Sequence, residues 1–374
     1  MANNTARLGD LATYINGYAF KPADWGDTGL PIIRIQDLTG NSYQLNRYDG
    51  EYPERIEVND GDVLISWSAS LGVYIWHRSK ALLNQHIFKV VFDKLPINKD
   101  YFVFAVEHKL AEMESKTHGA TMKHIVKKDF DGTIIPYPSI EKQAIIAEHL
   151  RRITNLIDRQ TEQLLLLDQL VKSRFIELFG DYDLTHPQES WVTIKEIGTV
   201  VGGATPKTDH DEYWGGSYRW ITPAELDADS GYIYDSVRKL TKAGVESCSL
   251  QEMPVGTVIL SSRAPIGKVA IAGNTFYCNQ GFKNIICKEG ITPRYLYTVL
   301  LLNVEYLNSL GRGATFKEIS KGIVESIRIP VPSMDLQQQF AAFVEQTDKS
   351  KLAVQKGLQE LELLKKSLMQ QYFG

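Results

Sequence analysis

Residues 119–143, GATMKHIVKKDFDGTIIPYPSIEKQ, recur at residues 313–337 as GATFKEISKGIVESIRIPVPSMDLQ. The two stretches align without a gap, and eleven of their twenty-five positions are identical. Ordinary residue frequencies would give about one or two identities over this length. The chain therefore contains an internal repeat, and a repeat decides the domain organisation before any other pattern.

The repeat extends beyond this stretch, but not evenly. At the same offset the match continues to residues 179–180 and 373–374, and it also runs upstream with small changes of offset. Segments 18–58 and 204–250, by contrast, hardly match. A shared scaffold with two dissimilar segments is typical of a binding device with two different ligands.

The globular part of each copy is predicted to have a mainly β core. Short segments rich in β-branched and aromatic residues and bounded by Gly, Asp or Asn are typical of strands. In the first copy these segments are residues 31–35, 62–66, 73–76 and 87–92. Residues 100–114 and 294–309 carry apolar side chains at helical spacing. Each copy is thus expected to be a mixed α/β domain.

A long helix is predicted to begin at Ser139. Two preceding prolines disfavour helix before it, and Ser139 is a good N-cap. Residues that are apolar except for Gln160 and Arg174 then recur at alternating steps of four and three, which is the heptad seam of a coiled coil. The seam positions are 146, 150, 153, 157, 160, 164, 167, 171, 174 and 178. In the second copy the expected seam is Val354, Leu358, Leu361, Leu364, Leu368 and Tyr372, with Thr347 and Lys351 interrupting its start.

The two helices are expected to pair with each other as an antiparallel coiled coil. At about 1.5 Å per residue, a helix from residue 141 to residue 179 is roughly 58 Å long, on the order of one to two turns of B-DNA. We therefore predict an α+β fold: two mixed α/β domains with mainly β cores, separated by two long antiparallel helices and related by an internal pseudo-twofold repeat. The predicted domains are residues 1–138 and 181–332, and the predicted helices are residues 139–180 and 333–374.

Composition favours a two-domain protein of the reducing cytoplasm. With 374 residues, of which 43% are hydrophobic, the chain can bury two domain cores. Three cysteines without a C-x-x-C pair indicate neither a zinc site nor a disulfide framework. The N-terminus lacks the apolar segment of a signal peptide, and no apolar run approaches about 20 residues, so no membrane association is expected.

Net charge and motifs limit the possible functions. The formal net charge of -4 lacks the excess of Lys and Arg that a protein binding DNA alone usually shows. Either the basic side chains gather on one face, or a partner chain supplies part of the phosphate contact. The sequence has no H-E-x-x-H, no P-loop, no complete dinucleotide fingerprint and no Asn/Asp-Pro-Pro-Tyr methyltransferase motif. We therefore predict neither a catalytic residue nor a metal site.

Short motifs of the second copy, in their order along the chain, give a family pattern. They are residues 202–206 (GGATP), 220–223 (WITP), 262–267 (SRAPIG), 279–282 (NQGF), 313–315 (GAT) and 329–332 (IPVP). Together with the duplication and the terminal helix, they resemble the specificity subunit of type I restriction-modification systems over essentially the whole chain. The first copy departs from the pattern at residues 17–20 and 67–72.

The resemblance implies a function in DNA recognition. In that family each domain binds one half of a bipartite double-stranded DNA target. The helices hold the domains apart and bind methyltransferase subunits, of which we expect two, and a restriction and translocation subunit joins the complex. The chain itself is then not an enzyme and carries no cofactor, and S-adenosylmethionine is expected on the methyltransferase partner. We assign partner contacts to the helix residues Ile146, Leu150, Ile157, Leu164, Leu167, Val171, Leu358, Leu361 and Leu368.

Two other interpretations stay open at this point. The chain could be the specificity subunit of a type IIB or type IIG-like system with different partner subunits. It could also be a scaffold that binds no DNA, with the coiled coil as its functional surface and the domains bound to proteins.

Basic side chains after the helix at residues 100–114 are candidates for phosphate contacts. They are Lys116, Lys123, His124, Lys127 and Lys128, with Arg312, Lys317 and Lys321 in the second copy. A solvated loop is the competing interpretation. Basic residues at matching positions of both copies favour DNA, although phosphate contacts position a protein without specifying sequence.

Base contacts require donors such as Arg, Lys or Gln that reach base edges in the major groove. The candidates are Arg34, Gln36, Arg47, Lys207, Arg219, Arg263 and Lys268. For each of them, a structural ion pair or a solvated side chain is the competing interpretation. The aromatic residues Tyr18, Trp25, Trp67, Tyr213 and Trp214 could stack on DNA, but packing is the commoner use of such side chains.

Overall fold

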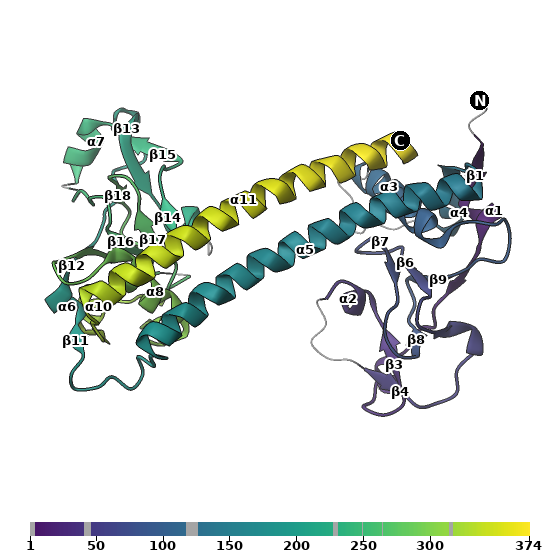
Figure 1. Ribbon diagram of the computed structural model, residues 1–374, viewed down its shortest axis with the longest axis horizontal. Coiled ribbons are helices and arrows are strands. Elements are labelled where there is room, and N and C mark those ends of the chain that lie inside the picture. Colours follow the sequence, from purple (N-terminus) through teal and green to yellow (C-terminus); the bar gives the residue numbers. More distant parts are fainter. Residues whose placement is uncertain are drawn as a thin grey trace. The chain divides into compact units, whose positions relative to one another are not determined.

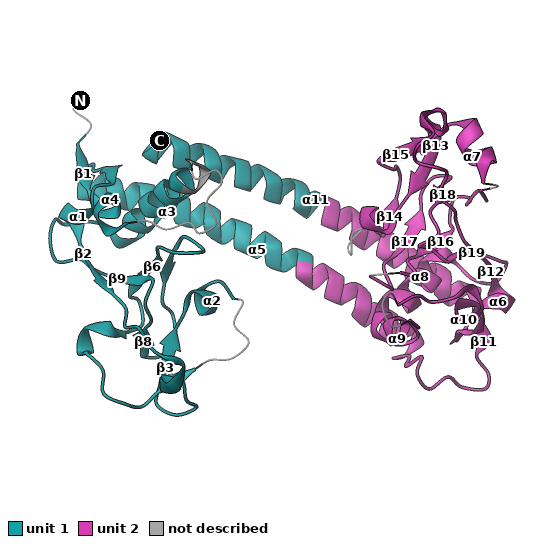
Figure 2. Ribbon diagram, turned by 180° about the vertical axis from the view of Figure 1, so that it is seen from behind, with its two compact units in different colours: residues 1–164, 353–374 teal, residues 165–352 magenta. Residues whose placement is uncertain are grey.

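The computed structural model describes residues 4–40, 46–116, 126–226, 231–248, 250–263, 265–313 and 317–374, with the side chains of residues 114–116 outside the description. Contacts divide the chain into two compact units (Figure 2). Unit 1 consists of residues 1–164 and 353–374, and unit 2 consists of residues 165–352. Each unit combines one globular region with part of each long helix (Figure 1). Within the described ranges, no helix is long and apolar enough to cross a membrane.

Unit 1 has two four-stranded sheets. Its strands are β1 (Thr5–Arg7), β2 (Thr13–Asn16), β3 (Leu30–Ile33), β4 (Arg47–Tyr48), β5 (Glu57–Val58), β6 (Val63–Ser66), β7 (Gly72–Ile75), β8 (Ala81–Leu83), β9 (Ile87–Val91) and β10 (Ile134–Pro136). Its helices are α1 (Leu8–Leu11), η1 (Pro22–Asp24), α2 (Ile35–Leu38), η2 (Glu54–Ile56), α3 (Lys99–Lys116), α4 (Lys127–Asp131) and the first part of α5 (Ile140–Phe179). The sheet β2-β9-β6-β7 is antiparallel, and the sheet β4-β3-β8-β5 is mixed because β3 and β8 are parallel. Strands β1 and β10 form a separate pair.

Unit 2 has a five-stranded and a three-stranded sheet. Its strands are β11 (Val192–Thr193), β12 (Gly198–Val201), β13 (Trp214–Ile221), β14 (Tyr232–Ile233), β15 (Arg238–Leu240), β16 (Val258–Leu260), β17 (Val269–Ala272), β18 (Tyr277–Cys278), β19 (Asn284–Cys287) and β20 (Arg328–Ile329). Its helices are α6 (Ile194–Ile197), η3 (Asp211–Tyr213), η4 (Pro223–Glu225), α7 (Lys242–Ser247), α8 (Pro293–Leu302), α9 (Val304–Ser309), α10 (Lys321–Ser326) and most of the first half of α11 (Met334–Phe373). The helix predicted at residues 294–309 is thus two helices, α8 and α9, with Asn303 between them. The sheets have the orders β12-β19-β16-β17-β14 and β15-β13-β18, and β11 pairs with β20.

Unit 2 repeats the topology of unit 1. The order β12-β19-β16-β17 corresponds to β2-β9-β6-β7, and β14 is added at the edge. The parallel pair β13–β18 corresponds to β3–β8. The turns after β3 and β13 are closed in the same way. The Arg34 amide donates to Asp37 at 2.8 Å, and the Thr222 amide donates to Glu225 at 2.9 Å. Segments 18–58 and 204–250 therefore share a strand and the turn that follows it, although their sequences hardly match.

In unit 1 the two long helices pack antiparallel. Ile146 and Leu150 of α5 lie in the same hydrophobic core as Phe373 of α11. Farther along α5, Gln160 lies against Gly357, where a Cβ would be 3.0 Å from the Gln160 side chain. Residue numbers thus rise along α5 as they fall along α11, which confirms the predicted pairing for this unit.

Unit 2 has the equivalent arrangement with the other ends of the helices. Phe175 of α5 is buried against Phe340 of α11, with ring centroids 5.4 Å apart, and stacks on Tyr295 of α8 at 5.7 Å. Asp168 forms an ion pair with Lys351. In each unit the ends of both helices therefore complete the core of the globular region. The boundaries at residues 138 and 332 stay predictions from the sequence, since the cores continue past them into the helices.

The predicted heptad seam holds for α5 and needs correction for α11. Every predicted α5 position is buried or half-buried. In α11, however, Leu364 is exposed, and the stem of Lys365 occupies the seam while its ammonium pairs with Glu107 at 3.4 Å. Thr347 is buried, and its hydroxyl donates to the helix backbone, so the polar group is satisfied there. Lys351 is half-buried in its ion pair. These polar residues belong to the seam, since each of them finds a partner there.

The residues assigned to partner contacts are buried or half-buried within the chain, and the assignment stays a prediction. Ile146 and Leu150 are no more than 5% exposed, and the other seven assigned residues are half-buried. Ile146 and Leu150 pack inside the chain, so they cannot contact another protein without unfolding unit 1. Contacts to a partner fit the exposed apolar side chains of the helices better. These include Leu156, Leu165, Leu166, Leu170, Leu352, Leu363 and Leu364.

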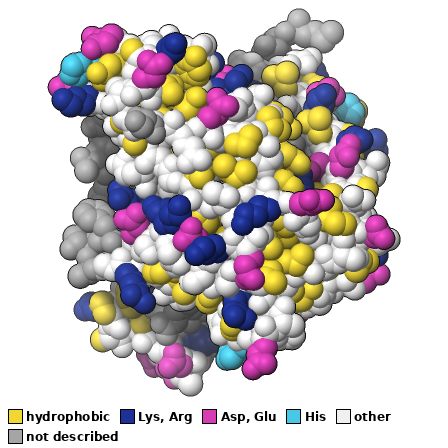
Figure 3. Space-filling view, turned by 90° about the vertical axis from the view of Figure 1, so that its left-hand side faces the viewer, with side chains coloured by type: hydrophobic (Ala, Val, Ile, Leu, Met, Phe, Trp, Pro, Cys, Tyr) yellow, Lys and Arg dark blue, Asp and Glu magenta, His cyan; other side chains and the backbone are white. Residues whose placement is uncertain are grey.

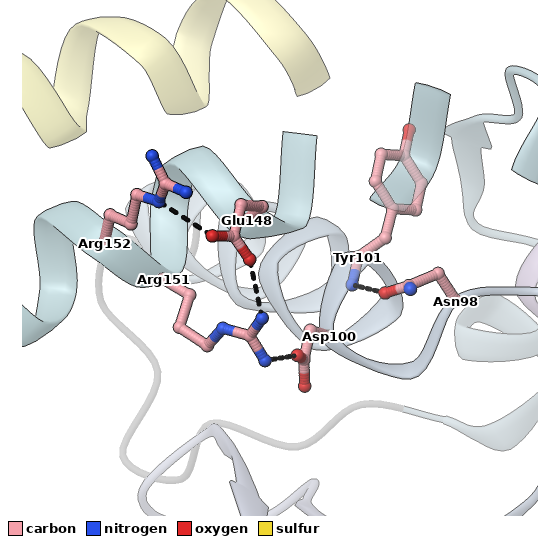
Figure 4. Close-up of polar contacts among 6 residues, drawn as sticks. All are labelled: Asn98, Asp100, Tyr101, Glu148, Arg151 and Arg152. Atoms are coloured by element: carbon pink, nitrogen blue, oxygen red, sulfur yellow. Dashed lines mark hydrogen bonds and ion pairs between the residues drawn. The ribbon is translucent and has the colours of Figure 1, made fainter. Parts of the chain in front are cut away.

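An ion-pair network joins α3 to α5 in unit 1 (Figure 4). Arg151 donates to Glu148 at 2.8 Å and to Asp100 at 2.9 Å, and Arg152 donates to Glu148 at 2.7 Å. Position 100 corresponds to Arg294 in the second copy, which pairs with Asp348 at 3.0 Å. The contact between the domain helix and the long helix is thus kept with its charges reversed. Exposed pairs of this kind add at most about 1 kcal/mol each, so they orient the helices more than they stabilise them.

Candidate nucleic-acid interface

Three sequence motifs of the second copy meet at one place in unit 2. The Ala204 amide donates to the Cys278 carbonyl at 3.0 Å, and the Trp220 indole donates to the Ala204 carbonyl at 3.1 Å. The Thr205 hydroxyl donates to Gln280 at 2.6 Å. Stretches that are far apart in the sequence are therefore held together by hydrogen bonds at the ends of β13 and β18.

The glycines at this place are required by close backbone contact. A Cβ on Gly203 would lie 2.0 Å from the Cys278 carbonyl oxygen, and one on the corresponding Gly17 would lie 1.9 Å from the Asn84 carbonyl oxygen. Such distances are far below van der Waals contact, so any side chain forces the loop open. Both copies therefore use glycine where the loop packs directly against the backbone, at Cys278 in unit 2 and at Asn84 in unit 1.

Replacing Gly203 with alanine is expected to destabilise unit 2 by about 1–3 kcal/mol, as overpacked sites do. Urea unfolding of the full chain measures the change. Gly322→Ala is the matched control because nothing lies within 4 Å of its Cβ position in α10. An exposed helical glycine gains up to about 1 kcal/mol when replaced by alanine. Equal unfolding midpoints for the two variants would contradict the assigned role of Gly203.

Beside this place, unit 2 carries a group of three charged residues, Arg263, Lys283 and Glu318, which we call the charged corner. The Arg263 guanidinium lies 3.0 Å from one carboxylate oxygen of Glu318, and the Lys283 ammonium lies 3.2 Å from the other. Backbone bridges pair Glu318 with both Arg263 and Arg312. Burial raises the pKa of Glu318, but its bonds to the two cations outweigh this effect, and the pKa lies below its ordinary value. The acid is therefore ionised and holds both cations.

The equivalent place in unit 1 carries Trp67, Ala69 and His86, which we call the aromatic corner. The Trp67 ring stacks on Phe88 at 5.5 Å and meets the His86 ring edge-on at 4.9 Å. Ala69 and His86 have φ of 61° and 71°, in the left-handed region that favours glycine. Side chains held in this region are strained, and such strain gathers at functional sites.

The two corners are equivalent in their backbone contacts. The Ser66 hydroxyl donates to the carbonyl four residues later at 2.5 Å, and the Ser261 hydroxyl does the same at 2.8 Å. The Trp67 amide donates to the His86 carbonyl, as the Ser262 amide donates to that of Gly281. One loop architecture thus presents different side chains in the two units.

The predicted DNA contacts divide into three groups. Lys127, Lys128, Lys207, Arg312 and Lys317 are exposed. Gln36 is exposed as well, and its side-chain amide lies against the Arg34 guanidinium. With the amide oriented so that its oxygen accepts, this oxygen lies 3.0 and 3.2 Å from two guanidinium nitrogens. Lys123 and His124 lie outside the described residues, and so does the side chain of Lys116. The exposed side chains are accessible to a phosphate, and their assignment to DNA stays a prediction.

Several other candidates are engaged within the chain. The Lys268 ammonium donates to the Pro223 and Leu226 carbonyls at 3.2 and 2.7 Å, so it holds a turn. The Arg47 guanidinium donates to the Gly29 carbonyl at 2.8 Å. The remaining ion pairs are Arg34 with Asp37, Arg219 with Asp235, and Lys321 with Glu325. Lys268 gives two donors and Arg47 gives one donor to backbone carbonyls, so both side chains help to hold the scaffold, and their assignment to DNA stays a prediction.

The aromatic candidates are also used largely in packing. The Arg238 guanidinium lies 3.5 Å over the Trp214 ring, and Tyr213 stacks on His210 at 5.0 Å. Trp25 is partly exposed, with Arg34 over its ring at 5.8 Å. Trp67 is the member of this set that lies at a corner.

The surface charge is mixed on the face shown in Figure 3. Dark-blue Lys and Arg side chains alternate there with magenta Asp and Glu side chains, and a hydrophobic area lies between them. This face is no uniform basic patch. Among the described residues there is also no group of three or more His, Cys, Asp or Glu side chains placed to hold a metal ion.

Comparison with known proteins identifies the class to which this architecture belongs. The family described as the type I restriction modification DNA specificity domain matches residues 3–167 and 189–363. The chain belongs to this family and carries two copies of its domain.

Related proteins agree with this membership. The MjaIX specificity subunit of Methanocaldococcus jannaschii is 43% identical over 185 residues, which cover 48% of this chain and 43% of that protein. The EcoBI specificity subunit of Escherichia coli is 30% identical over 168 residues, covering 44% and 35%. These two alignments span less than half of each relative. The MjaVIII specificity subunit of M. jannaschii is 24% identical over 393 residues, covering 97% and 90%.

Solved structures share the fold. The type I restriction-modification S subunit from M. genitalium has a TM-score of 0.59 at 15% identity, covering 99% of this chain and 96% of that one. A chain from a structural study of complex assembly and conformational transition in the type I restriction-modification system has a TM-score of 0.54 at 17% identity, covering 99% and 97%. The α+β architecture predicted from the repeat is thus confirmed.

Proposed function

We propose that the chain is the DNA sequence-specificity subunit of a type I restriction-modification complex, and that each unit binds one half of a bipartite double-stranded DNA target. The observation that carries the proposal is the pair of equivalent corners. One backbone scaffold presents a guanidinium, an ammonium and a carboxylate in unit 2 and a strained aromatic group in unit 1. A protein that binds two different sequences with two copies of one domain needs this combination of constant scaffold and variable side chains.

The chemistry is assigned to partner chains. The sequence has no Asn/Asp-Pro-Pro-Tyr methyltransferase motif and no P-loop, so we place methyl transfer on methyltransferase subunits that carry S-adenosylmethionine, and cleavage on a restriction and translocation subunit. Two methyltransferase subunits fit the duplication, one for each unit. Because the proposed substrate is chromosomal DNA, we place the complex in the cytoplasm. A shared grip on DNA also agrees with the net charge of -4.

The proposal is tested by the methylation that the chain directs. Coexpressed with its cognate methyltransferase subunits in a host without that modification, the chain is expected to produce one bipartite methylated motif with a fixed non-specific spacer. Single-molecule methylome sequencing measures the motif. A contiguous motif, or none at all, would sink the proposal. Replacing residues 18–135 with those of a relative is expected to change one half-site and leave the other half-site and the spacer as they were.

A further inference from the structure

The charged corner leaves Arg263 partly free for another contact. A guanidinium has five N–H donors in a planar fork, and Glu318 lies against one terminal nitrogen, Nη2. The Arg263 side chain is 46% exposed. The donors that Glu318 does not take are enough for the bidentate contact that arginine makes to guanine O6 and N7.

Glu318 is itself held in place from two sides. Lys283, whose side chain is only 14% exposed, binds the second carboxylate oxygen and also donates to the Ser262 hydroxyl at 3.3 Å. The Glu318 backbone is bridged to Arg263 and Arg312. The carboxylate is therefore fixed, and a fixed carboxylate limits the rotamers of the arginine that it binds. Ordering the side chain in advance removes an entropic cost that DNA binding would otherwise carry.

Stability alone gives little reason for the Arg263–Glu318 pair. Both partners are a third or more exposed, and such pairs are worth about 0–1 kcal/mol. Copy one has Ser68 and Phe88 where copy two has Arg263 and Lys283. The equivalent corner of unit 1 is nevertheless folded, with Trp67 stacked on Phe88. The ion-pair group is thus dispensable for building the corner.

We propose that Arg263 contacts a guanine in the half-site bound by unit 2, and that Glu318 is the positioning residue that aims its guanidinium. The proposal rests on the function proposed above and adds the base and the residue pair.

The test uses the full chain with its cognate methyltransferase subunits and the methylome assay. For Arg263→Ala, discrimination against other bases is expected to fall about 10-fold to 100-fold at one guanine position of one half-site. For Glu318→Gln, which keeps the size of the side chain, a smaller loss of about 3-fold to 10-fold is expected at the same position, since the guanidinium is still present but no longer fixed. Glu325→Gln is the matched control because Glu325 pairs with Lys321 outside the corner, and its motif is expected to equal that of the wild type.

Arg263→Lys keeps the proposal testable if the alanine variant fails to fold. Lysine keeps the charge but has no planar fork, so the same position is expected to relax. A wild-type chain without a bipartite motif overturns the proposed function. A wild-type motif that persists unchanged in Arg263→Lys overturns the assignment of Arg263. A loss of DNA affinity that is the same for all sequences, together with a weaker salt dependence of DNA binding, would show that Arg263 contacts a phosphate. That outcome also overturns the assignment of Arg263 to a guanine. Glu318→Gln with the wild-type motif overturns the positioning role.

Discussion

Inserting one heptad into each long helix, after Leu164 in α5 and after Leu352 in α11, is expected to lengthen the spacer of the DNA target by about three base pairs. Both helices are continuous across the boundary between the units. Seven residues add about 10.5 Å at 1.5 Å per residue, and B-DNA rises about 3.4 Å per base pair. Seven is also the heptad period, so the seam keeps facing the same side. Both half-sites are expected to stay as they are, because neither globular region changes.

Methylome sequencing of the variant measures the spacer directly. The control is the same insertion in α5 alone. In that variant α11 keeps its length, so the longer α5 has to loop out or lose the contact of Phe175 with Phe340. A loss of methylation is therefore expected for the single insertion. A matched insertion that alters a half-site, or leaves the spacer unchanged, would rule out the helices as the element that sets it.

The repeat made most of the fold predictable from the sequence. Matching stretches in the same order along the chain predicted two domains of one topology, and the step of three and four predicted the buried face of α5. The prediction for α11 failed at Leu364, because the helix places the stem of Lys365 in the seam and pairs its ammonium with Glu107. A pattern of apolar residues alone does not reveal a polar residue whose partner lies on another element.

The candidate interface was less predictable for the same reason. Lys268 and Arg47 carry the charge expected of DNA contacts, yet both also donate to backbone carbonyls within the chain, which the sequence does not reveal. Glu318 was missed, since an acid within a basic segment gives no signal until the fold brings it to Arg263. The left-handed backbone at His86 also has no signature in a single sequence. Motif order did locate the region, because the motif residues Thr205 and Gln280 do meet.

Replacing Phe175 with alanine is expected to lower the free energy of unfolding of unit 2 by about 3–5 kcal/mol, the usual range for a buried phenylalanine. The ring is 2% exposed and contacts Tyr295 and Phe340. It also lies 4.9 Å from the ring of Phe179. Alanine leaves a cavity that these three rings cannot close. Urea unfolding of the full chain, followed by tryptophan fluorescence, measures the change.

Leu170→Ala is the matched control, since it lies on the same helix and is 48% exposed. It is expected to change the stability by no more than about 0.5 kcal/mol. The contrast tests whether the end of α5 is a structural part of unit 2 or a linker that follows unit 1. If α5 only connected the domains, both variants would unfold like the wild type. A loss of stability that is confined to the Phe175 variant means that α5, the helix of the first copy, completes the hydrophobic core of unit 2. The second copy alone then does not contain a whole hydrophobic core.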